Sequence, residues 1–441
     1  MATTIEIRPG YAQLPVGSAA VNYAAITVRP DLTVQQRASV QLGLVIDTSG
    51  SMDGQIHGKF SQKKIDLVRE SAQRAINGLS DGDYLTIVAF SDRVQILAFA
   101  QQVGPDRSQL LRAVGNLRAN GGTLMGDGIA TALRELRNLP GAGVSGATGA
   151  AIRELVVLTD GQTNDEDICY QLAEQTDVPL MLGGIGDDYN GTLLNEMARS
   201  SRGMAQYIDR AEAVGDFFGE VMATVEATVL TNAVLSFDFR QRFRPLRIHE
   251  VAPELKSFDF TPVTPANRRT QVALGDIQKE GLTLLVQYAY EGGAGFANEF
   301  QVAALDLSYD MPPQTGLSVN SDDYTVLLAD EAGFPEMDPA VKAYIDQAEV
   351  ETAQTRLLSA AKAGDVAGAT RHLDALQQNL QRVGADQGFI QQTVQTMRLT
   401  LQNTGDAAQL ADSSATKRLT SGTRKLVLPP QEQDQAPDQQ S

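Results

Sequence analysis

The stretch VQLGLVIDTSGSM, residues 40–52, carries an apolar run straight into an acid and a series of hydroxyl groups. From Val40 to Ile46 the run is apolar on both alternating faces, which is typical of a parallel strand buried between helices. Asp47 follows this strand, and Ser49 and Ser51 come two and four positions after it. Because the spacing is two, we expect these three side chains to point toward one centre while the residues between them make the bend.

Short apolar runs and helical patterns alternate over residues 40–228. Apolar runs at 85–90, 155–158 and 179–185 predict three further buried strands, and a run at 94–99 is expected to pair with the first of them as a hairpin. Strand and helix in alternation predict a doubly wound, Rossmann-like α/β domain, with a parallel sheet and helices on both faces. One of the helical patterns is made by Ile65, Val68, Ala72, Ala75, Ile76 and Leu79.

The spacing of apolar residues changes to two from about residue 229, so residues 229–335 are predicted to form an antiparallel β-sandwich. Leu235, Phe237 and Phe239, for example, alternate with polar residues. A slip of phase near residues 304–305 predicts a β-bulge. Residues 1–39 also look like strands but have no sheet of their own. We therefore expect them to join the sandwich, with the α/β domain inserted between its two pieces.

Residues 338–404 are predicted to form a helical hairpin or bundle, and residues 405–441 a mostly disordered tail. Asp338 and Pro339 make a typical helix start, an N-cap followed by a proline. Apolar residues spaced three and four apart predict a second and a third helix after it. From Pro429 the tail is rich in Gln, Asp and Pro, which is typical of disorder. Its basic residues are expected to be solvated, namely Lys417, Arg418, Arg424 and Lys425.

Charge and composition narrow the classes of function. The chain has 36 Lys plus Arg against 54 Asp plus Glu, a formal net charge of −18. A field of this sign repels nucleic-acid phosphates and attracts cations. The single cysteine, Cys169, and three scattered histidines exclude a disulfide framework and a structural zinc site. There is no apolar run long enough to span a membrane and no signal-peptide pattern, so we expect a cytoplasmic protein without a membrane segment.

Two further stretches place oxygen-bearing side chains at the same edge of the predicted sheet as Asp47. NGGTLMGDGI puts Thr123 in a Gly-rich loop before a helix, and LVVLTDGQTNDED puts Asp160 directly after a buried strand. Ligands of open α/β sheets bind at the carboxyl ends of the strands, so we expect these residues to converge with Asp47, Ser49 and Ser51. Such a set of hard oxygen ligands suits Mg²⁺ or Mn²⁺.

The D-x-S-x-S spacing, the Thr of the G-G-T loop and the T-D-G after a central strand resemble the von Willebrand factor A (VWA) domain and its metal-ion-dependent adhesion site. The resemblance covers about residues 40–228. It implies that hydroxyls bind the ion directly, that carboxylates bind it directly or through water, and that an Asp or Glu of a protein partner fills an open position. The cofactor would be Mg²⁺, or Mn²⁺ or Ca²⁺, and the site would serve docking rather than catalysis. The implied metal residues are Asp47, Ser49, Ser51, Thr123 and Asp160.

Three residues near the expected site have an open assignment. Met52 and Met125 are interpreted either as contacts for a partner at the rim or as loop packing. His57 either touches a partner or is a solvated loop residue. The flanking parts of the chain resemble inter-alpha-trypsin-inhibitor heavy chains and other multidomain bacterial A-domain proteins only loosely.

Other functions are weighed against this interpretation. A haloacid-dehalogenase-type phosphatase needs a second Asp as general acid where this chain has Ser49, so an enzyme of that class is not expected. An accessory subunit of a separate AAA+ ATPase, of the MoxR or chelatase kind, is the main alternative to a simple docking protein. A surface adhesin would need a secretion route. The first hypothesis is a non-enzymatic protein that captures an acidic partner through a divalent ion.

Overall fold

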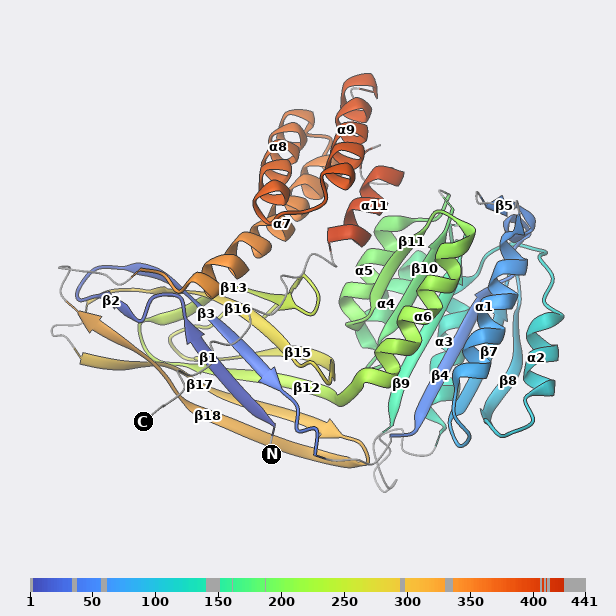
Figure 1. The fold of residues 1–441 in the computed structure, drawn as a ribbon, viewed down its shortest axis with the longest axis horizontal. Coiled ribbons are helices and arrows are strands. Elements are labelled where there is room, and N and C mark those ends of the chain that lie inside the picture. Colours follow the sequence, from blue (N-terminus) through green and yellow to red (C-terminus); the bar gives the residue numbers. More distant parts are fainter. Residues whose placement is uncertain are drawn as a thin grey trace, which may run out of the picture.

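The computed structural model describes residues 3–33, 38–56, 62–139, 151–160, 162–186, 188–293, 298–329 and 336–404, together with 407, 410 and 413–423. Three parts are visible in Figure 1: an α/β domain, a pair of mainly antiparallel sheets beside it, and a group of C-terminal helices above both. Among the described helices, none combines the length and the apolar character needed to cross a bilayer.

The α/β domain is built on a six-stranded sheet, as the alternation of strand and helix predicted. The sheet has the order β11-β10-β9-β4-β7-β8, and all neighbours are parallel except β7 and β8, which form the expected hairpin. The strand at the centre is fully buried along its length, which explains its apolar sequence on both faces. The strands are β4 (Val40–Asp47), β7 (Tyr84–Phe90), β8 (Val94–Gln102), β9 (Ile152–Thr159), β10 (Leu180–Ile185) and β11 (Met204–Ile208).

Helices cover both faces of this sheet, and each face has its own hydrophobic core. Ile65, Leu110 and Phe217 belong to one core, whereas Ile129 and Leu193 belong to the other. The prediction of a doubly wound α/β domain is therefore confirmed. The first core receives α1 (Lys64–Gly78), α2 (Ser108–Gly115) and α6 (Ala211–Ala227), and the second receives α3 (Met125–Arg137), α4 (Glu166–Gln175) and α5 (Gly191–Ser201). A short helix η1 (Gly50–Asp53) and a two-residue pair, β5 (Gln55–Ile56) and β6 (Gln62–Lys63), stand between β4 and α1.

Two five-stranded sheets share a separate core of large side chains, among them Phe237 and Tyr288. β3 pairs with β16, so strands from both ends of the α/β domain lie in one sheet. The register of β17 and β18 shifts between Ala303 and Leu305, close to the predicted bulge. One sheet contains β1 (Thr4–Pro9), β3 (Ala20–Arg29), β16 (Leu282–Tyr290), β13 (Phe243–Ala252) and β14 (Lys256–Ser257). The other contains β15 (Arg269–Gln278), β12 (Thr228–Phe239), β17 (Asn298–Met311), β18 (Gln314–Ala329) and β2 (Gln13–Pro15).

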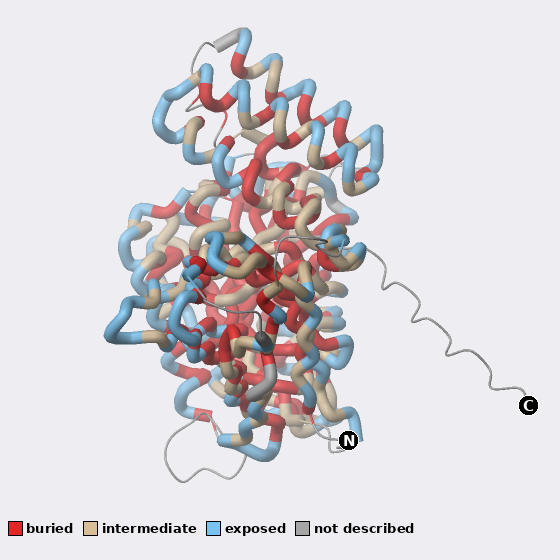
Figure 2. The backbone as a smooth tube through the Cα atoms, turned by 90° about the vertical axis from the view of Figure 1, so that its left-hand side faces the viewer, coloured by how far each residue is buried: buried red, intermediate tan, exposed pale blue. Residues whose placement is uncertain are grey.

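The C-terminal helices pack on one another and on the sheets. Asp338 caps the first helix as expected, because its Oδ1 accepts hydrogen bonds from the backbone N–H groups of Ala340 and Val341. The helices share a core with Val251 and Leu285 of the sheets, and Figure 2 shows buried positions along the helices as well as through the body below them. They are α7 (Pro339–Lys362), α8 (Val366–Arg382), α9 (Gln387–Thr404) and α11 (Ser414–Thr423).

Helix α11 corrects one part of the predicted disordered tail, residues 414–423, and the predicted solvation of two of its four basic residues. The side chain of Lys417 is buried, its Nζ donates to the backbone oxygen of Tyr189 over 2.8 Å, and it lies 4.1 Å from the centre of the Tyr189 ring. Arg418 pairs with Asp209 at 3.1 Å. A ten-residue helix gives little sequence signal, because its burial depends on a surface made by distant residues. Arg424 and Lys425 lie outside the described residues.

Lys417→Met should loosen α11 from the α/β domain without unfolding the rest. The substitution removes one buried hydrogen bond and one cation–π contact, which together are worth about 1–2 kcal/mol. The backbone N–H of Tyr207 donates to Ser421 of α11, so hydrogen exchange at this amide reports on docking. We expect faster exchange in the variant. Lys63→Met, the same substitution at a lysine that is 49% exposed in the α/β domain, is the matched control and should leave this exchange unchanged.

Candidate metal centre

Two buried acids stand side by side where the central strands end. β4 and β9 are parallel neighbours with Ile46 opposite Leu158, so Asp47, the last residue of β4, and Asp160, just after β9, reach the same edge. Both carboxylates are fully buried, with 0% of each residue exposed. Two adjacent buried acids repel one another and lose hydration, so the fold must supply hydrogen bonds or positive charge at this point.

Hydroxyl and backbone groups link the two acids. The backbone N–H of Ser49 donates to Asp47 Oδ1 at 2.7 Å. The Oγ atoms of Ser49 and Ser51 lie 3.0 Å apart, and Ser51 Oγ donates to Asp160 Oδ1 at 2.7 Å. The structure therefore brings four of the five predicted metal residues into one connected group. This is the arrangement that the spacing of two in the first loop predicted.

The loop that carries Thr123 packs against both of the other loops. Gly50 N–H donates to the backbone oxygen of Gly121 at 3.0 Å, and Asn164 N–H donates to the backbone oxygen of Thr123 at 3.4 Å. Gly121 has a φ of +86°, and a Cβ there would lie 2.6 Å from an oxygen of Asp92, so glycine is required at this bend. Thr123 is half-buried beside the acids' loops, on the segment that leads into α3.

Asp47 is held by hydrogen bonds to both oxygens of its carboxylate. Thr159 Oγ1 donates to Asp47 Oδ2 at 2.7 Å, opposite the Ser49 amide. Burial raises the pKa of the Asp47 carboxyl above its ordinary value, and the charge of Asp160 adds to this effect. The hydrogen bonds from Ser49 and Thr159 oppose it by stabilising the ionised form.

Lys64 is the residue of this site that sequence reasoning missed. Its Nζ lies 2.7 Å from Asp160 Oδ2, and the ion pair is almost completely enclosed, with side-chain exposures of 9% and 0%. In the sequence Lys64 is the second of two lysines at the start of a helix, a place where lysine is ordinarily solvated. The neighbouring Lys63 behaves in that way, since its side chain is 49% exposed and pairs with the exposed Asp53.

The partner-contact role suggested for two methionines is wrong. Met52 is 0% exposed and Met125 is 2% exposed, so neither can form the rim of a docking surface. Met52 lies in the core beneath α1, and Met125 lies in the core of the opposite face as the first residue of α3. The alternative of loop packing describes both. His57, the third rim candidate, lies outside the described residues.

The donor set fits a hard divalent cation in its chemistry. All the candidate groups offer oxygen, from hydroxyls and carboxylates, which suits Mg²⁺, Mn²⁺ or Ca²⁺ better than softer metals. Over the described part of the chain, no three or more His, Cys, Asp or Glu side chains are grouped in a way that could hold a metal ion. A cation here would therefore have to rest on hydroxyls beside the two acids, which is what the linked Ser49, Ser51 and Asp160 provide.

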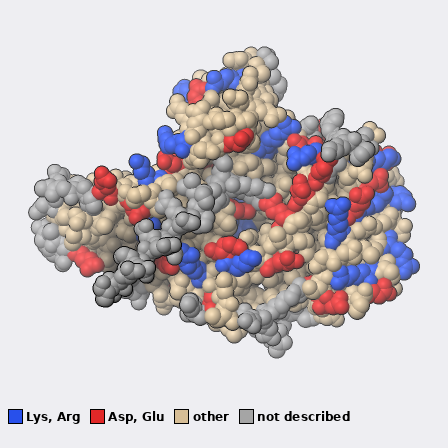
Figure 3. Space-filling model, in the orientation of Figure 1, with Lys and Arg blue, Asp and Glu red and all other residues tan. Residues whose placement is uncertain are grey.

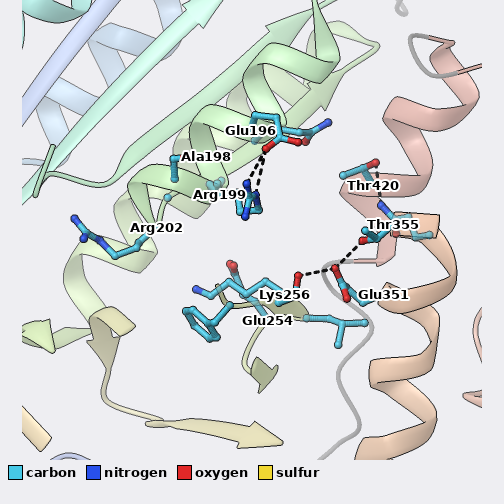
Figure 4. A pocket seen from close by; sticks show the side chains of 18 of the residues that line it. Glu196, Ala198, Arg199, Arg202, Glu254, Lys256, Glu351, Thr355 and Thr420 are labelled. Carbon is cyan, nitrogen blue, oxygen red and sulfur yellow. Dashed lines mark hydrogen bonds and ion pairs between the residues drawn. The ribbon is translucent and has the colours of Figure 1, made fainter. Parts of the chain in front are cut away.

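A separate cavity of about 360 Å³ lies where the three parts of the chain meet (Figure 4). Its walls come from α5, β14, α7 and α11. Polar side chains around it bond to one another: Arg199 pairs with Glu196 at 3.1 Å, and Glu351 accepts hydrogen bonds from Ser257 and Thr355 at 3.0 and 2.9 Å. Sequence patterns do not predict this cavity, because its walls come from segments far apart in the chain.

Comparison with known proteins agrees with the α/β fold. Residues 42–220 match the family model described as von Willebrand factor type A domain. The chain contains a VWA domain. Beyond this domain, the uncharacterized protein sll0103 of Synechocystis sp. is 26% identical over 353 residues, which cover 77% of this chain and 78% of that protein. Inter alpha-trypsin inhibitor heavy chain 4 of Mus musculus is 27% identical over 190 residues, 40% of this chain but only 19% of the mouse protein.

Solved structures show the same fold around the VWA domain. A structure described as von Willebrand factor type A from Catenulispora acidiphila has a TM-score of 0.73 and 20% identity, and the match covers 97% of this chain and 98% of that one. The ArnB paralog VWA2 from Sulfolobus acidocaldarius has a TM-score of 0.59 and 14% identity, over 97% and 100% of the two chains. These likenesses concern the fold alone.

Proposed function

We propose that this protein is a non-enzymatic binding module whose VWA domain holds a divalent cation and uses it to capture an acidic side chain of a protein partner. The observation that carries the proposal is the connected group of Ser49, Ser51 and Asp160 beside Asp47, at the carboxyl edge of the sheet. Proteins of the VWA family are interaction modules, which supports a docking role rather than a catalytic one.

Different residues of the chain would supply the negative charge, the neutral ligands and the fixed orientation that such a site needs. Asp47 and Asp160 supply negative charge, and the hydroxyls of Ser49, Ser51 and Thr123 supply neutral oxygen ligands. When bound, the cation would act as a Lewis acid that attracts an anionic oxygen of the partner. Thr159 and the Ser49 amide fix the orientation of the Asp47 carboxylate. Holding a ligand in place in advance reduces the entropy that binding must overcome.

The net charge of −18 opposes the approach of an acidic partner from a distance, but the surface is not uniform. On the face drawn in Figure 3, Lys and Arg side chains stand beside Asp and Glu side chains over the α/β domain. At physiological salt, fields between exposed charges fade over about 8 Å. We therefore expect the charge at the site itself, rather than the charge of the whole chain, to decide which partner group binds.

Thr123→Ala should weaken Mg²⁺ binding by about tenfold, because it removes one hydroxyl ligand and leaves both acids in place. Calorimetric titration of the full chain with Mg²⁺, Mn²⁺ and Ca²⁺ measures the effect and ranks the ions. Protein capture from an extract should also depend on Mg²⁺ and fall in EDTA or in the variant. Thr370→Ala is the control, since this exposed hydroxyl of α8 bonds only within its helix.

The proposal fails in two recognisable ways. If the wild-type chain binds none of the three ions at millimolar concentration, there is no metal site. If it binds an ion but captures its partners equally well in EDTA, the site is not the docking point.

A further inference from the structure

The side chain of Lys64 is buried and points into the site, whereas the first residue of a helix ordinarily has a solvated side chain. Its backbone N–H donates to the oxygen of Gly54 at 2.9 Å, which fixes the start of α1 against the loop after η1. From there its side chain enters the edge of the sheet, and Nζ reaches Asp160 Oδ2 at 2.7 Å. Because 91% of the side chain is removed from water, the ammonium has given up most of its hydration for this contact.

Two glycines lie against the lysine side chain, on two different loops. A Cβ on Gly186, which follows β10, would lie 3.4 Å from Nζ of Lys64, and one on Gly54 would lie 4.0 Å from its Cε. Gly186 also has a φ of +79°, which other residues rarely adopt. The loops after β4 and β10 thus form a slot that holds the ammonium against Asp160.

The ion pair between Lys64 and Asp160 offsets the repulsion between the two buried acids of the proposed metal site. If there were neither a metal ion nor Lys64, Asp160 would be a buried carboxylate next to a second buried carboxylate, Asp47. The hydrogen bond from the Ser51 hydroxyl relieves this only in part, because a hydroxyl carries no net charge. Lys64 supplies that charge from within the chain.

We propose that Lys64 is the built-in counter-ion of the VWA site: it stabilises the metal-free state by pairing with Asp160, and it weakens metal binding through its positive charge. The inference rests on the proposed function, since it assigns a role toward the same cation. Lys64 is a positioning and charge-setting residue and is not itself a metal ligand.

The charges of the three buried groups explain what such a residue achieves. Asp47, Asp160 and Lys64 together carry one negative charge, so a bound divalent cation leaves one positive charge. Without the lysine, the same two acids would neutralise the ion completely. The excess positive charge favours an anionic group of a partner over water at the open position. Lys64 therefore trades affinity for the metal against affinity for an acidic partner.

Lys64→Met tests both halves of the inference, because it keeps an unbranched side chain that is only one atom shorter and removes the charge. In EDTA the variant should melt about 5–10 °C below the wild type, since it leaves a buried acid unpaired. With Mg²⁺ this difference should shrink, and calorimetry should give a dissociation constant about tenfold lower than that of the wild type. Lys63→Met is the matched control: the same substitution one position earlier, at an exposed pair, should change neither value.

Two further variants keep the test decisive if Lys64→Met folds poorly. Lys64→Gln retains a hydrogen-bond donor without charge. It should also lower the melting temperature in EDTA and tighten Mg²⁺ binding, but by less than Lys64→Met does. Lys64→Met combined with Asp160→Asn removes both charges and should recover stability in EDTA while losing Mg²⁺ binding.

The outcomes separate this inference from the proposed function. If the wild type binds Mg²⁺ and Lys64→Met binds it equally or more weakly, the lysine is not a competing charge and the inference is overturned. If neither protein binds a divalent ion, the proposed metal-dependent docking is rejected, and so is the proposed competition between Lys64 and the metal ion. If Lys64→Met is as stable as the wild type in EDTA, the counter-ion role is overturned whatever the metal does.

Discussion

Asp47→Asn is expected to lose Mg²⁺ binding by about 100-fold or more, and yet to melt above the wild type in EDTA by about 3 °C. The two effects have one cause. The carboxylate that attracts the ion is fully buried and faces Asp160, and its pKa is raised by burial and by that second charge. The folded state therefore disfavours its ionised form, and a neutral amide of the same shape removes the penalty. Titration calorimetry and thermal melting in EDTA measure the two effects.

The amide can keep the contacts that hold the side chain in place. Its oxygen can accept the Ser49 N–H, and the Thr159 hydroxyl can rotate to accept from its NH₂ group. Asp53→Asn is the control, because this acid belongs to the same loop but is 62% exposed. It should leave both the melting temperature and the Mg²⁺ affinity unchanged. If Asp47→Asn instead melts below the wild type in EDTA, the ionised carboxylate stabilises the fold, and the prediction is wrong.

The parts of the fold that the sequence predicts well are those fixed by local pattern. The strand over 40–46 is apolar on both faces, and the helix after Asp338 has a cap and a proline in its first turn, so neighbours in the chain are sufficient to identify them. The convergence of Asp47 and Asp160 followed from a general rule, namely that parallel strands end at a common edge.

The features that escaped the sequence all depend on the burial of a single side chain. Lys63 and Lys64 are the same residue type one position apart, but only the second enters the slot beside Gly186. Met52 and Met125 belong to loops that look exposed, and helical packing covers both. Burial of this kind is decided by elements far away in the chain, which a periodic pattern cannot register.

A second pair of buried acids, far from the metal site, should make stability depend on pH. Glu154 of β9 and Asp276 of β15 belong to the α/β domain and to the sheet pair, and both line one small cavity where these parts meet. Both oxygens of Glu154 are buried and have no hydrogen-bond partner. Burial raises the pKa of Glu154 well above its ordinary value, and the charge of Asp276 adds to this. Burial also raises the pKa of Asp276, from 3.8 to about 7, although a backbone N–H and the charges of Arg202 and Arg153 lower it.

The direction of the effect follows from these raised values. In the unfolded chain both acids lose their protons near pH 4, whereas in the folded chain they keep them to higher pH. The folded state thus binds more protons between about pH 4 and 7, and its stability falls as pH rises through this window. Each unit of pKa shift is worth about 1.4 kcal/mol. Since Asp276 is partly exposed, we discount the full value and expect a loss of about 2 kcal/mol by pH 8.

Asp276→Asn should therefore match the wild type near pH 4 and exceed it at pH 8 by about 2 kcal/mol in free energy of unfolding. An amide resembles the protonated acid, so the two proteins differ only where the acid must ionise. Glu154→Gln should change stability in the same direction. Urea titrations at both pH values measure the difference, and Glu280→Gln, at a residue that is 56% exposed, is the control. Equal stability of Asp276→Asn and the wild type at pH 8 would mean that this junction accepts the ionised acid without cost.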